Sequence, residues 1–333
     1  MKKSMALALA LAVSAAAGPG MLSAQEKLAQ TGFEFLSVGP AGRASGLADA
    51  VTTASGYSGA LFYNPAGLAG MTGLVDVTAS LNDWIADIRH YAFSVSVAPA
   101  NEKYGVIGIG VMYVNYGEFQ GTMVWNNDQG YIDTEVFTPH AMAVGIGYAK
   151  SLSDRFAVGG QIKYVSQSSG RNIIPDETSE TGLGISKNVL STWAIDFGTL
   201  YRTGFKSLAF GMSVRNLSRE VKYDQDGFQL PMMFRMGISM DLLDLLPRFS
   251  NIHSLLLAVD AVHPRSHSEY IGIGLEYTFL KLLSVRVGYL SNQDEVGLTY
   301  GFGIQRFGLA FDYAYTPFGV FDNVQKMTVR FSL

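Results

Sequence analysis

The chain has no cysteine among its 333 residues, and this absence removes several kinds of chemistry. Disulfides, Fe–S clusters, thiol nucleophiles and cysteine-based zinc sites are all excluded. Charged residues are also scarce, at 16% of the chain, whereas soluble proteins average about a quarter. A chain without cysteine is compatible with export through an oxidising periplasm.

Long apolar runs are missing as well. After residue 24 no stretch of about 20 apolar residues occurs, so the sequence predicts no transmembrane helix. Yet 48% of the residues are hydrophobic, which leaves either a large soluble core or a membrane β-barrel. Thirty-seven glycines and 12% aromatic residues favour the barrel. Aromatic residues gather at both membrane interfaces, and glycine serves where strands bend.

Signatures of nucleic-acid binding and of catalysis are absent too. The formal net charge is −4 and no basic run occurs, so no nucleic-acid partner is expected. His263 and His267 lie four residues apart without a third ligand nearby, and we expect neither a metal site nor a cofactor. Residues 56–60 miss the last glycine of a Gly-x-Ser-x-Gly elbow, and no enzymatic activity is expected.

Residues 1–24 are predicted to be a signal peptide that is cut before Gln25. Lys2 and Lys3 form its charged start, an apolar stretch follows, and residues 22–24 precede the cut. An N-terminal anchor helix is the alternative, which the shortness of the apolar stretch disfavours. Together with the β-barrel that the composition favours, this predicts a protein exported to the bacterial outer membrane.

Apolar residues alternate with small, polar or charged ones along most of the remaining chain, including residues 327–333. Period two places successive side chains on opposite faces of a β-strand. A transmembrane barrel has lipid on one face and a polar or small-residue interior on the other. Its strands need about 9–11 residues. Fourteen segments approach that size, at about 74–81, 88–97, 104–116, 136–149, 155–166, 190–202, 206–216, 230–240, 252–262, 269–279, 282–290, 295–304, 307–316 and 324–333.

The connections between these segments differ in length in an alternating way, as bacterial barrels require. The compact ones, expected in the periplasm with both termini, are 98–103, 150–154, 203–205, 280–281 and 305–306. The long ones, expected as external loops, are 117–135, 167–189 and 217–229. The exception is 241–251, which is long for a periplasmic turn. Its leucine spacing predicts either a short amphipathic helix ended by Pro247 or a simple loop.

Residues 25–73 are rich in glycine and alanine and show no sustained alternation. They are long for a tail and too irregular for strands. We expect a plug or hatch folded into the barrel, with a periplasmic extension as the alternative. The predicted organisation is therefore a signal peptide over 1–24, a hatch over 25–73 and a barrel over 74–333.

Two motifs in this segment resemble those of the PorV/PorQ family of outer-membrane proteins. FLSVGPAGRASGLADA, at residues 35–50, resembles the family's opening motif. LFYNPAGLA, at residues 61–69, resembles the Asn-Pro-Ala-Gly motif that the family shares with FadL-type transporters. The glycine after Asn-Pro-Ala looks more like the PorV branch. The resemblance implies an all-β, FadL-like antiparallel barrel of fourteen strands with an N-terminal hatch.

The resemblance also implies two alternative functions. For PorV-like members it implies a role in type IX protein secretion, with the translocon and the C-terminal signal domains of secreted clients as partners beside outer-membrane lipid. For FadL-like members it implies passage of a hydrophobic small molecule across the outer membrane. The two longest loops are polar here, which departs from the apolar capture loops of fatty-acid transporters and argues against such a capture site.

Two groups of candidate residues lie in the hatch. The residues of the first group suit a tight turn. This turn either seats and releases the hatch, or is a static link between the hatch and the first strand. It consists of Asn64, Pro65, Ala66 and Gly67. The glycines of the second group would let the hatch backbone approach the barrel wall closely. The alternative is that they make this entry segment flexible. The second group consists of Gly39, Gly42, Arg43 and Gly46.

A third group of candidates consists of charged residues that alternation turns toward the barrel interior. The signs are mixed, which favours ion pairs that hold the hatch over a selective ion channel. Arg43 is expected to pair with Asp260, Glu276 or Asp312. The inward set is Lys163, Asp196, Arg215, Arg235, Asp260, Glu276, Arg286, Asp312 and Arg330.

Overall fold

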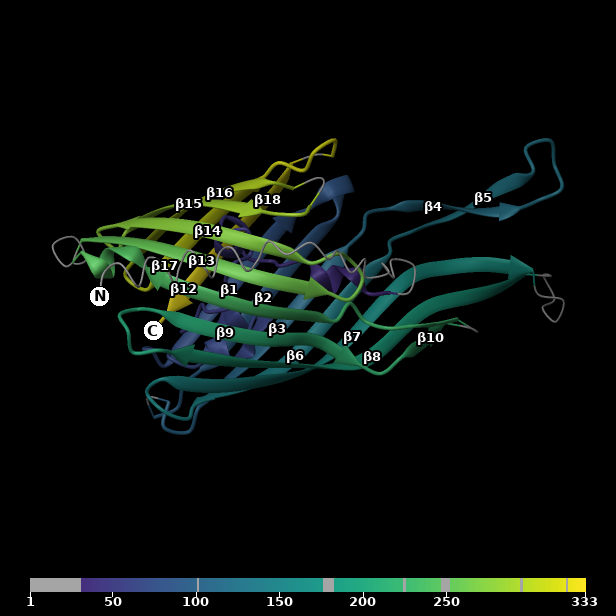
Figure 1. Ribbon diagram of the computed structural model, residues 1–333. Coiled ribbons are helices and arrows are strands. Elements are labelled where there is room, and N and C mark those ends of the chain that lie inside the picture. Colours follow the sequence, from purple (N-terminus) through teal and green to yellow (C-terminus); the bar gives the residue numbers. More distant parts are fainter. Residues whose placement is uncertain are drawn as a thin grey trace, which may run out of the picture.

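The alternating segments form fourteen antiparallel strands that close into one barrel (Figure 1). The computed structural model describes residues 31–100, 102–175, 183–223, 226–246, 252–293, 296–321 and 323–333. The predicted signal peptide lies outside the described residues. The first and last strands pair from Asp76 opposite Ser332 to Asp83 opposite Gln325, and this ladder completes the ring.

Every predicted strand segment corresponds to one barrel strand, so the predicted fold is confirmed. Most strand ends lie within about four residues of the expected ones, as sequence patterns allow. The strands are β1 (Val75–Asp83), β2 (Arg89–Val97), β3 (Val106–Asn115), β6 (His140–Ser151), β7 (Phe156–Pro175), β8 (Leu183–Arg202), β9 (Ala209–Ser218), β12 (Met233–Asp241), β13 (His253–Pro264), β14 (Tyr270–Phe279), β15 (Leu283–Leu290), β16 (Leu298–Arg306), β17 (Leu309–Thr316) and β18 (Val324–Ser332).

The two ends of the barrel differ, and we name them by their connections. At the short-turn end, few residues join β2 to β3, β6 to β7, β8 to β9, β14 to β15 and β16 to β17. The longer connection from β12 to β13 lies at the same end and contains one 3₁₀ turn, η6 (Leu242–Leu245), capped by the Asp241 carboxylate. Pro247 lies outside the described residues. The opposite end is the long-loop end, where η5 (Ile85–Asp87) joins β1 to β2.

The long connections contain more β-structure than the sequence predicted. Residues expected as a loop form the hairpin β4 (Phe119–Val124) and β5 (Tyr131–Phe137), which projects beyond the barrel (Figure 1). The rings of Phe119 and Phe137 stack across it at 6.1 Å, the kind of cross-strand pair that stabilises two strands. In addition, β7 and β8 pair beyond the barrel as far as Pro175 opposite Leu183. Between β9 and β12, β10 (Val221–Tyr223) pairs with β11 (Asp226–Phe228).

Large apolar side chains cover the outside of the barrel wall. On β8, Trp193, Ile195 and Phe197 are exposed while Asp196 between them is buried. On β18, Val329 is 51% exposed and its neighbour Thr328 only 4%. An apolar outer band of this kind suits contact with lipid hydrocarbon. Across the described residues, helices of the length and apolarity needed to span a bilayer do not occur.

Residues 31–73, named the internal segment here, lie inside the ring. They form four short helices, η2 (Glu34–Ser37), α2 (Gly42–Ser45), η3 (Ser58–Phe62) and η4 (Pro65–Leu68). The α2 helix packs on β16, β17 and β18, whereas η3 and η4 pack on β2, β3 and β6 to β8 across the interior. The apolar core lies between this segment and the wall, with Leu47, Leu61 and Leu68 at most 1% exposed.

A charge placed on the outer band tests whether that band contacts lipid. Val329 lies near the middle of β18, so Val329→Arg should lower stability in lipid vesicles by about 2–4 kcal/mol. Val124→Arg, in the projecting hairpin where Val124 is 88% exposed, is the matched control and should change little. Urea unfolding in vesicles measures both. Equal stability of the two variants would contradict a lipid-facing wall.

Candidate ligand cavity

The Asn64 side chain ties the internal segment to the wall. Its Oδ1 accepts from the Ala66 N–H at 3.1 Å, which caps η4. Its Nδ2 donates to the Thr52 carbonyl at 2.7 Å and to the Thr199 carbonyl of β8 at 3.1 Å. Asn64 is 1% exposed, so each of these bonds is made in the dry interior. One amide thus joins two parts of the segment to a barrel strand.

The wall is shaped to receive this motif. Gly159 on β7 pairs with Gly198 on β8, and a Cβ on Gly198 would collide with Asn64 Oδ1. A Cβ on Gly159 would lie 2.5 Å from the Pro65 carbonyl carbon. Pro65 begins η4, where its missing N–H costs nothing. The contacts of residues 64–67 form a close-packed turn against the wall, with Gly67 buried beside Ala54.

The opening motif lies against the other side of the barrel. The Gly42 N–H donates to Thr328 Oγ1 at 2.9 Å, and a Cβ on Gly42 would lie 3.0 Å from the Lys326 carbonyl oxygen. The Gly39 carbonyl accepts from Lys326 Nζ at 2.8 Å. Gly46 ends α2. Close backbone approach therefore accounts for the residue type at Gly42, since the wall leaves no room for a side chain.

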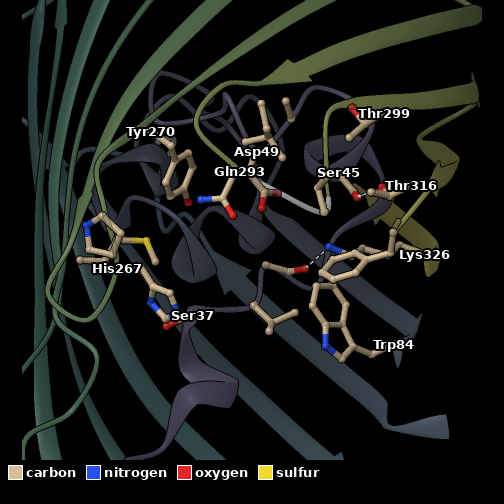
Figure 2. Close-up of a pocket in the computed structure, with 18 residues that line it drawn as sticks. Ser37, Ser45, Asp49, Trp84, His267, Tyr270, Gln293, Thr299, Thr316 and Lys326 are labelled. Carbon is tan, nitrogen blue, oxygen red and sulfur yellow. Dashed lines mark hydrogen bonds between the residues drawn. The ribbon is translucent and has the colours of Figure 1, made fainter. Parts of the chain in front are cut away.

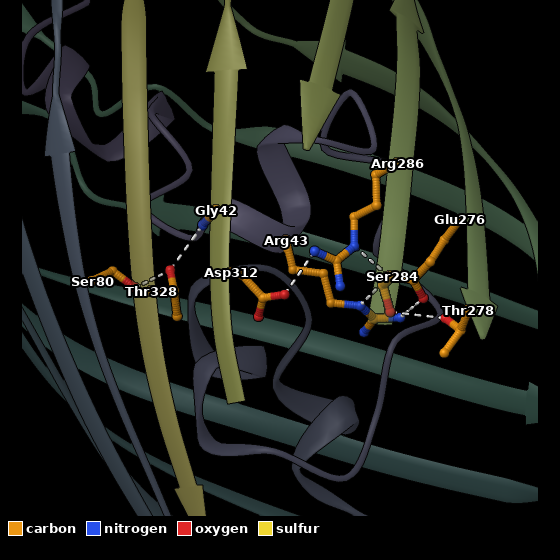
Figure 3. A network of polar contacts seen from close by, with 9 residues as sticks. All are labelled: Gly42, Arg43, Ser80, Glu276, Thr278, Ser284, Arg286, Asp312 and Thr328. Carbon is orange, nitrogen blue, oxygen red and sulfur yellow. Dashed lines mark hydrogen bonds and ion pairs between the residues drawn. The ribbon is translucent and has the colours of Figure 1, made fainter. Parts of the chain in front are cut away.

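Arg43 joins the internal segment to a row of charges on β14, β15 and β17 (Figure 3). Its Nε and Nη2 bind the Glu276 carboxylate at 3.0 and 2.8 Å. Arg286 binds Glu276 from the other side and reaches Asp312 Oδ1 at 2.7 Å. The Glu276 carboxylate raises the pKa of the Arg43 guanidinium above its usual value, so the guanidinium stays charged. Of the three acidic candidates for Arg43, the structure thus places Glu276 beside it.

Two further ion pairs hold inward-facing residues. Lys163 Nζ lies 2.8 Å from Asp196 Oδ2, and these side chains are 7% and 1% exposed. Arg330 Nε lies 2.6 Å from Asp76 Oδ2, and its Nη2 donates to the Gly56 carbonyl at 2.8 Å. Asp76 was missed by the sequence reasoning, although it shares a strand face with the other inward residues of β1. Lys326 was missed in the same way on β18.

The remaining inward charges bind the internal segment directly. Asp260 Oδ2 accepts from the Thr52 hydroxyl at 2.6 Å, Arg235 donates to the Asp49 carbonyl at 3.0 Å, and Arg215 donates to the Leu36 carbonyl at 3.2 Å. Asp260 is therefore occupied by Thr52 rather than by Arg43. The nine predicted residues do not form one cluster but are spread around the wall, each against a neighbouring polar group.

A cavity of about 260 Å³ lies between the internal segment and the long-loop end of the barrel (Figure 2). Its lining is mostly apolar, and the internal segment supplies one side of it. The lining residues are Ser37, Val38, Gly39, Ser45, Ala48, Asp49, Trp84, Met233, Pro264, His267, Tyr270, Leu290, Gln293, Val296, Thr299, Thr316, Phe318 and Lys326. We call this space the long-loop cavity.

An aromatic group forms one wall of the long-loop cavity. The Trp84 and Phe318 rings meet edge to face at 5.3 Å. Lys326 Nζ lies 5.4 Å from the Trp84 ring centre, and its charge is also held by the Gly39 carbonyl (Figure 2). Trp84, Phe318 and Gln293 come from connections between strands, so no period in the sequence could have identified them. The cavity can hold a small, mostly apolar molecule against an aromatic surface.

A second cavity lies on the opposite side of α2, toward the short-turn end. Its volume is about 490 Å³, and charged residues line much of it. Arg43 and Ala44 face this short-turn cavity, whereas Ser45 faces the long-loop cavity. One four-residue helix therefore borders both spaces. No group of three or more His, Asp or Glu that could hold a metal ion occurs within the described ranges.

Comparison with known proteins gives a fold likeness. The sequence matches no protein-family model and no curated protein. The structure is similar to the toluene transporter TodX of Pseudomonas putida, at 12% identity and a TM-score of 0.56 over 86% of this chain and 95% of that one. It is similar to the monoaromatic hydrocarbon channel CymD, at 12% identity and 0.57 over 89% and 98%.

A FadL homologue of Pseudomonas aeruginosa is a third similar structure, at 10% identity and a TM-score of 0.53 over 89% of this chain and 100% of that one. These likenesses cover 95% or more of each neighbour's chain. At such low identity they show the fold alone. The chain therefore has a FadL-like fourteen-stranded barrel, as its motifs and strand count predicted.

The buried Lys163–Asp196 pair should carry much of the local stability. Asp196→Asn removes the carboxylate and leaves the buried Lys163 amine without its counter-charge, which typically costs about 3–5 kcal/mol. Asp83→Asn is the control, because Asp83 and Arg89 form an ion pair at 3.3 Å with side chains 49% and 59% exposed. That change should cost about 1 kcal/mol or less. Urea unfolding compares the two, and similar losses would contradict this assignment.

Arg43→Ala should loosen α2 without unfolding the barrel. The Arg43 side chain is 34% exposed, so solvent screening reduces its bond to Glu276 to about 1 kcal/mol, or roughly fivefold in local opening. Hydrogen exchange at the Ser45 and Gly46 amides measures this opening. The Gly67 amide, bonded to the Asn64 carbonyl at 2.9 Å, is the internal control. Unchanged exchange at Ser45 and Gly46 would show that Arg43 does not hold α2.

Proposed function

We propose that this chain is an outer-membrane channel that takes up small hydrophobic molecules from outside the cell. The observation that carries the proposal is the long-loop cavity, a mostly apolar space of about 260 Å³ inside a barrel with a FadL-like fold. Ligand pockets are concave and mostly apolar, with a few polar groups that orient the ligand. Here the Trp84 and Phe318 rings supply the apolar surface.

The size of the cavity points to a small ligand. Drug-sized ligands occupy pockets of about 300–1,000 Å³, and the long-loop cavity is below that range at about 260 Å³. A single aromatic ring fits such a space better than a long acyl chain. The fold neighbours described as a toluene transporter and a monoaromatic hydrocarbon channel support the same ligand class.

The outer membrane as location is part of this proposal. The apolar outer band, the closed ring and the fold neighbours support it. Membership of the PorV branch and a role in type IX secretion rest on the motif resemblance of residues 35–50 and 61–69. The mostly apolar long-loop cavity favours passage of a small molecule over the handling of secreted proteins.

Filling the cavity tests the proposal. Leu290 lines the cavity on β15, so Leu290→Trp should weaken binding of toluene to the purified protein by on the order of tenfold, or about 1.4 kcal/mol. The neighbouring Tyr289 points outward and is 49% exposed. Tyr289→Trp is therefore the matched control and should leave binding unchanged. Isothermal titration calorimetry in detergent measures both variants.

Uptake by intact cells gives the functional arm of the same test. A Gram-negative host without hydrocarbon channels of its own should accumulate radiolabelled toluene faster when it produces the wild-type protein. Production of the Leu290→Trp variant should remove most of that gain. Equal binding and uptake by the two variants, or no uptake by the wild type, would refute the channel proposal.

A further inference from the structure

The Asp49 carboxylate has no hydrogen-bond partner within the described part of the chain. The backbone of this residue is well held, since its N–H donates to the Ala44 carbonyl at 2.8 Å and its carbonyl accepts from Arg235 at 3.0 Å. The carboxylate Oδ1, by contrast, is buried and meets no donor. A buried acceptor without a partner costs free energy comparable with that of a hydrogen bond. The fold itself therefore gives this carboxylate no partner.

The inward-facing acidic side chains of the wall differ from Asp49, because each of them has a bound oxygen. Their partners are basic side chains or a hydroxyl group, in the pairs Asp76–Arg330, Asp196–Lys163, Asp260–Thr52, Glu276–Arg43 and Asp312–Arg286. A narrow interior requires such pairing of a carboxylate, since an isolated buried charge is costly. Asp49 is the exception to this set, and an unsatisfied polar group in a native structure calls for an explanation.

The position of Asp49 suggests that explanation. Asp49 lines the long-loop cavity and is only partly buried there. Tyr270 and Gln293 line the same space, and Figure 2 shows all three side chains directed into it. Within the described ranges, neither the Tyr270 hydroxyl nor the Gln293 amide is used in a hydrogen bond. A carboxylate that can only accept hydrogen bonds thus faces a ligand-sized space, beside two more polar groups that can orient a ligand.

The long-loop cavity has room for one aromatic ring and a small polar substituent. A dry cavity of about 150 Å³ is enough for benzene, and the long-loop cavity measures about 260 Å³. The Trp84 and Phe318 rings form its aromatic surface. Aromatic rings pack favourably on one another in offset or edge-to-face arrangements. A ligand with its ring against this surface can present a polar substituent to Asp49.

The charges around Asp49 favour a neutral substituent. Lys326 and Arg235 both interact electrostatically with Asp49, so a positively charged ligand would be repelled by two cations while one anion attracts it. These cations are themselves bound, Lys326 to the Gly39 carbonyl and Arg235 to the Asp49 carbonyl. A ligand carboxylate would therefore find neither of them free, and Asp49 would repel it. A neutral hydroxyl group, which can donate to Asp49, meets neither obstacle.

We propose that Asp49 makes the long-loop cavity selective for phenols: the ligand ring packs against Trp84 and Phe318, and its hydroxyl donates to the Asp49 carboxylate. The inference rests on the channel function proposed above and narrows its substrate class from small hydrophobic molecules to hydroxylated compounds with one aromatic ring. A hydrogen bond to a charged acceptor is about twice as strong as one between neutral groups. A hydrocarbon would leave the carboxylate desolvated and unpaired, and a site that binds a hydroxyl rejects the analogue without it.

Toluene and p-cresol provide the test, because they differ by one hydroxyl group. Asp49→Asn keeps the size of the side chain, and asparagine tolerates the left-handed backbone of this position, where φ is 55°. The affinity for p-cresol should fall at least fivefold relative to the affinity for toluene, because the acceptor loses its charge. Asp49→Gly removes the acceptor, and glycine adopts this conformation readily, so the relative loss should be at least tenfold. Isothermal titration calorimetry in detergent measures both ligands.

Asp87→Asn is the matched control. Asp87 has the same left-handed backbone, with φ at 58°, but it is exposed in η5 and does not line the long-loop cavity. This substitution should leave both affinities unchanged. If both Asp49 variants weaken toluene and p-cresol equally, Asp49 only shapes the cavity and the selectivity is overturned. An unchanged ratio of the two affinities in both variants would overturn it as well.

Benzoate and benzylammonium test the charge argument on the wild-type protein. Each replaces the hydroxyl with a charged group, and each should bind at least tenfold more weakly than p-cresol. Tighter binding of either ion than of p-cresol would overturn the preference for a neutral donor.

The same titrations separate failure of this inference from failure of the proposed channel. If the wild type binds toluene and p-cresol, and their ratio does not depend on residue 49, the selectivity fails and the channel function stands. If the wild type binds neither molecule, both fail. Binding of p-cresol that depends on Asp49, together with retained binding of toluene, supports both.

Discussion

The closed ring imposes one constraint on which the rest of the structure depends: the inward-facing polar groups must find partners inside. Pairing of β1 with β18 leaves neither terminal strand with an unpaired edge. Closure of the ring also directs every second side chain of each strand into a narrow interior, where an unpaired charge is costly. The wall carries Lys163, Arg235 and Arg286 in that interior, each 5% exposed or less. The internal segment and the opposite charges of the wall supply the partners.

The irregular backbone of the internal segment is what makes it a suitable partner. A regular helix uses its carbonyl groups within itself, whereas short 3₁₀ turns and extended stretches leave many of them free. Four such carbonyls accept from cations of the wall: Leu36 from Arg215, Gly39 from Lys326, Asp49 from Arg235, and Gly56 from Arg330. The internal segment carries few charges, yet its carbonyl groups accept hydrogen bonds from the many charged side chains of the wall. Its glycines and alanines allow this because they let the backbone come close.

The alternation of apolar and polar residues explains which features of the barrel and its interior could be predicted from the sequence. The period of two depends on one strand at a time, so the fourteen strands and the inward direction of Asp196 or Arg286 follow from local sequence. Partners across the interior depend on the register of distant strands and on the path of the internal segment. No local pattern therefore selects Glu276 over Asp260 for Arg43. The β4–β5 hairpin was missed because its polar residues resemble a loop, and the cavity was missed because Trp84 and Phe318 lie in connections.

The two cavities differ in polarity: the long-loop cavity is mostly apolar, whereas charged residues line much of the short-turn cavity. A hydrophobic molecule gains roughly 25 cal/mol for each Å² of apolar surface that it buries, and the long-loop cavity offers such surface at Trp84, Leu290 and Phe318. Beyond α2 the ionic row of Arg43, Glu276 and Arg286 offers little for an apolar molecule to bind. Under the proposed channel function, a ligand would thus be held in the long-loop cavity and only weakly in the short-turn cavity. The proposed capture and release would then need no tight site on the short-turn side, because the row of charges that binds Arg43 also disfavours retention of an apolar molecule there.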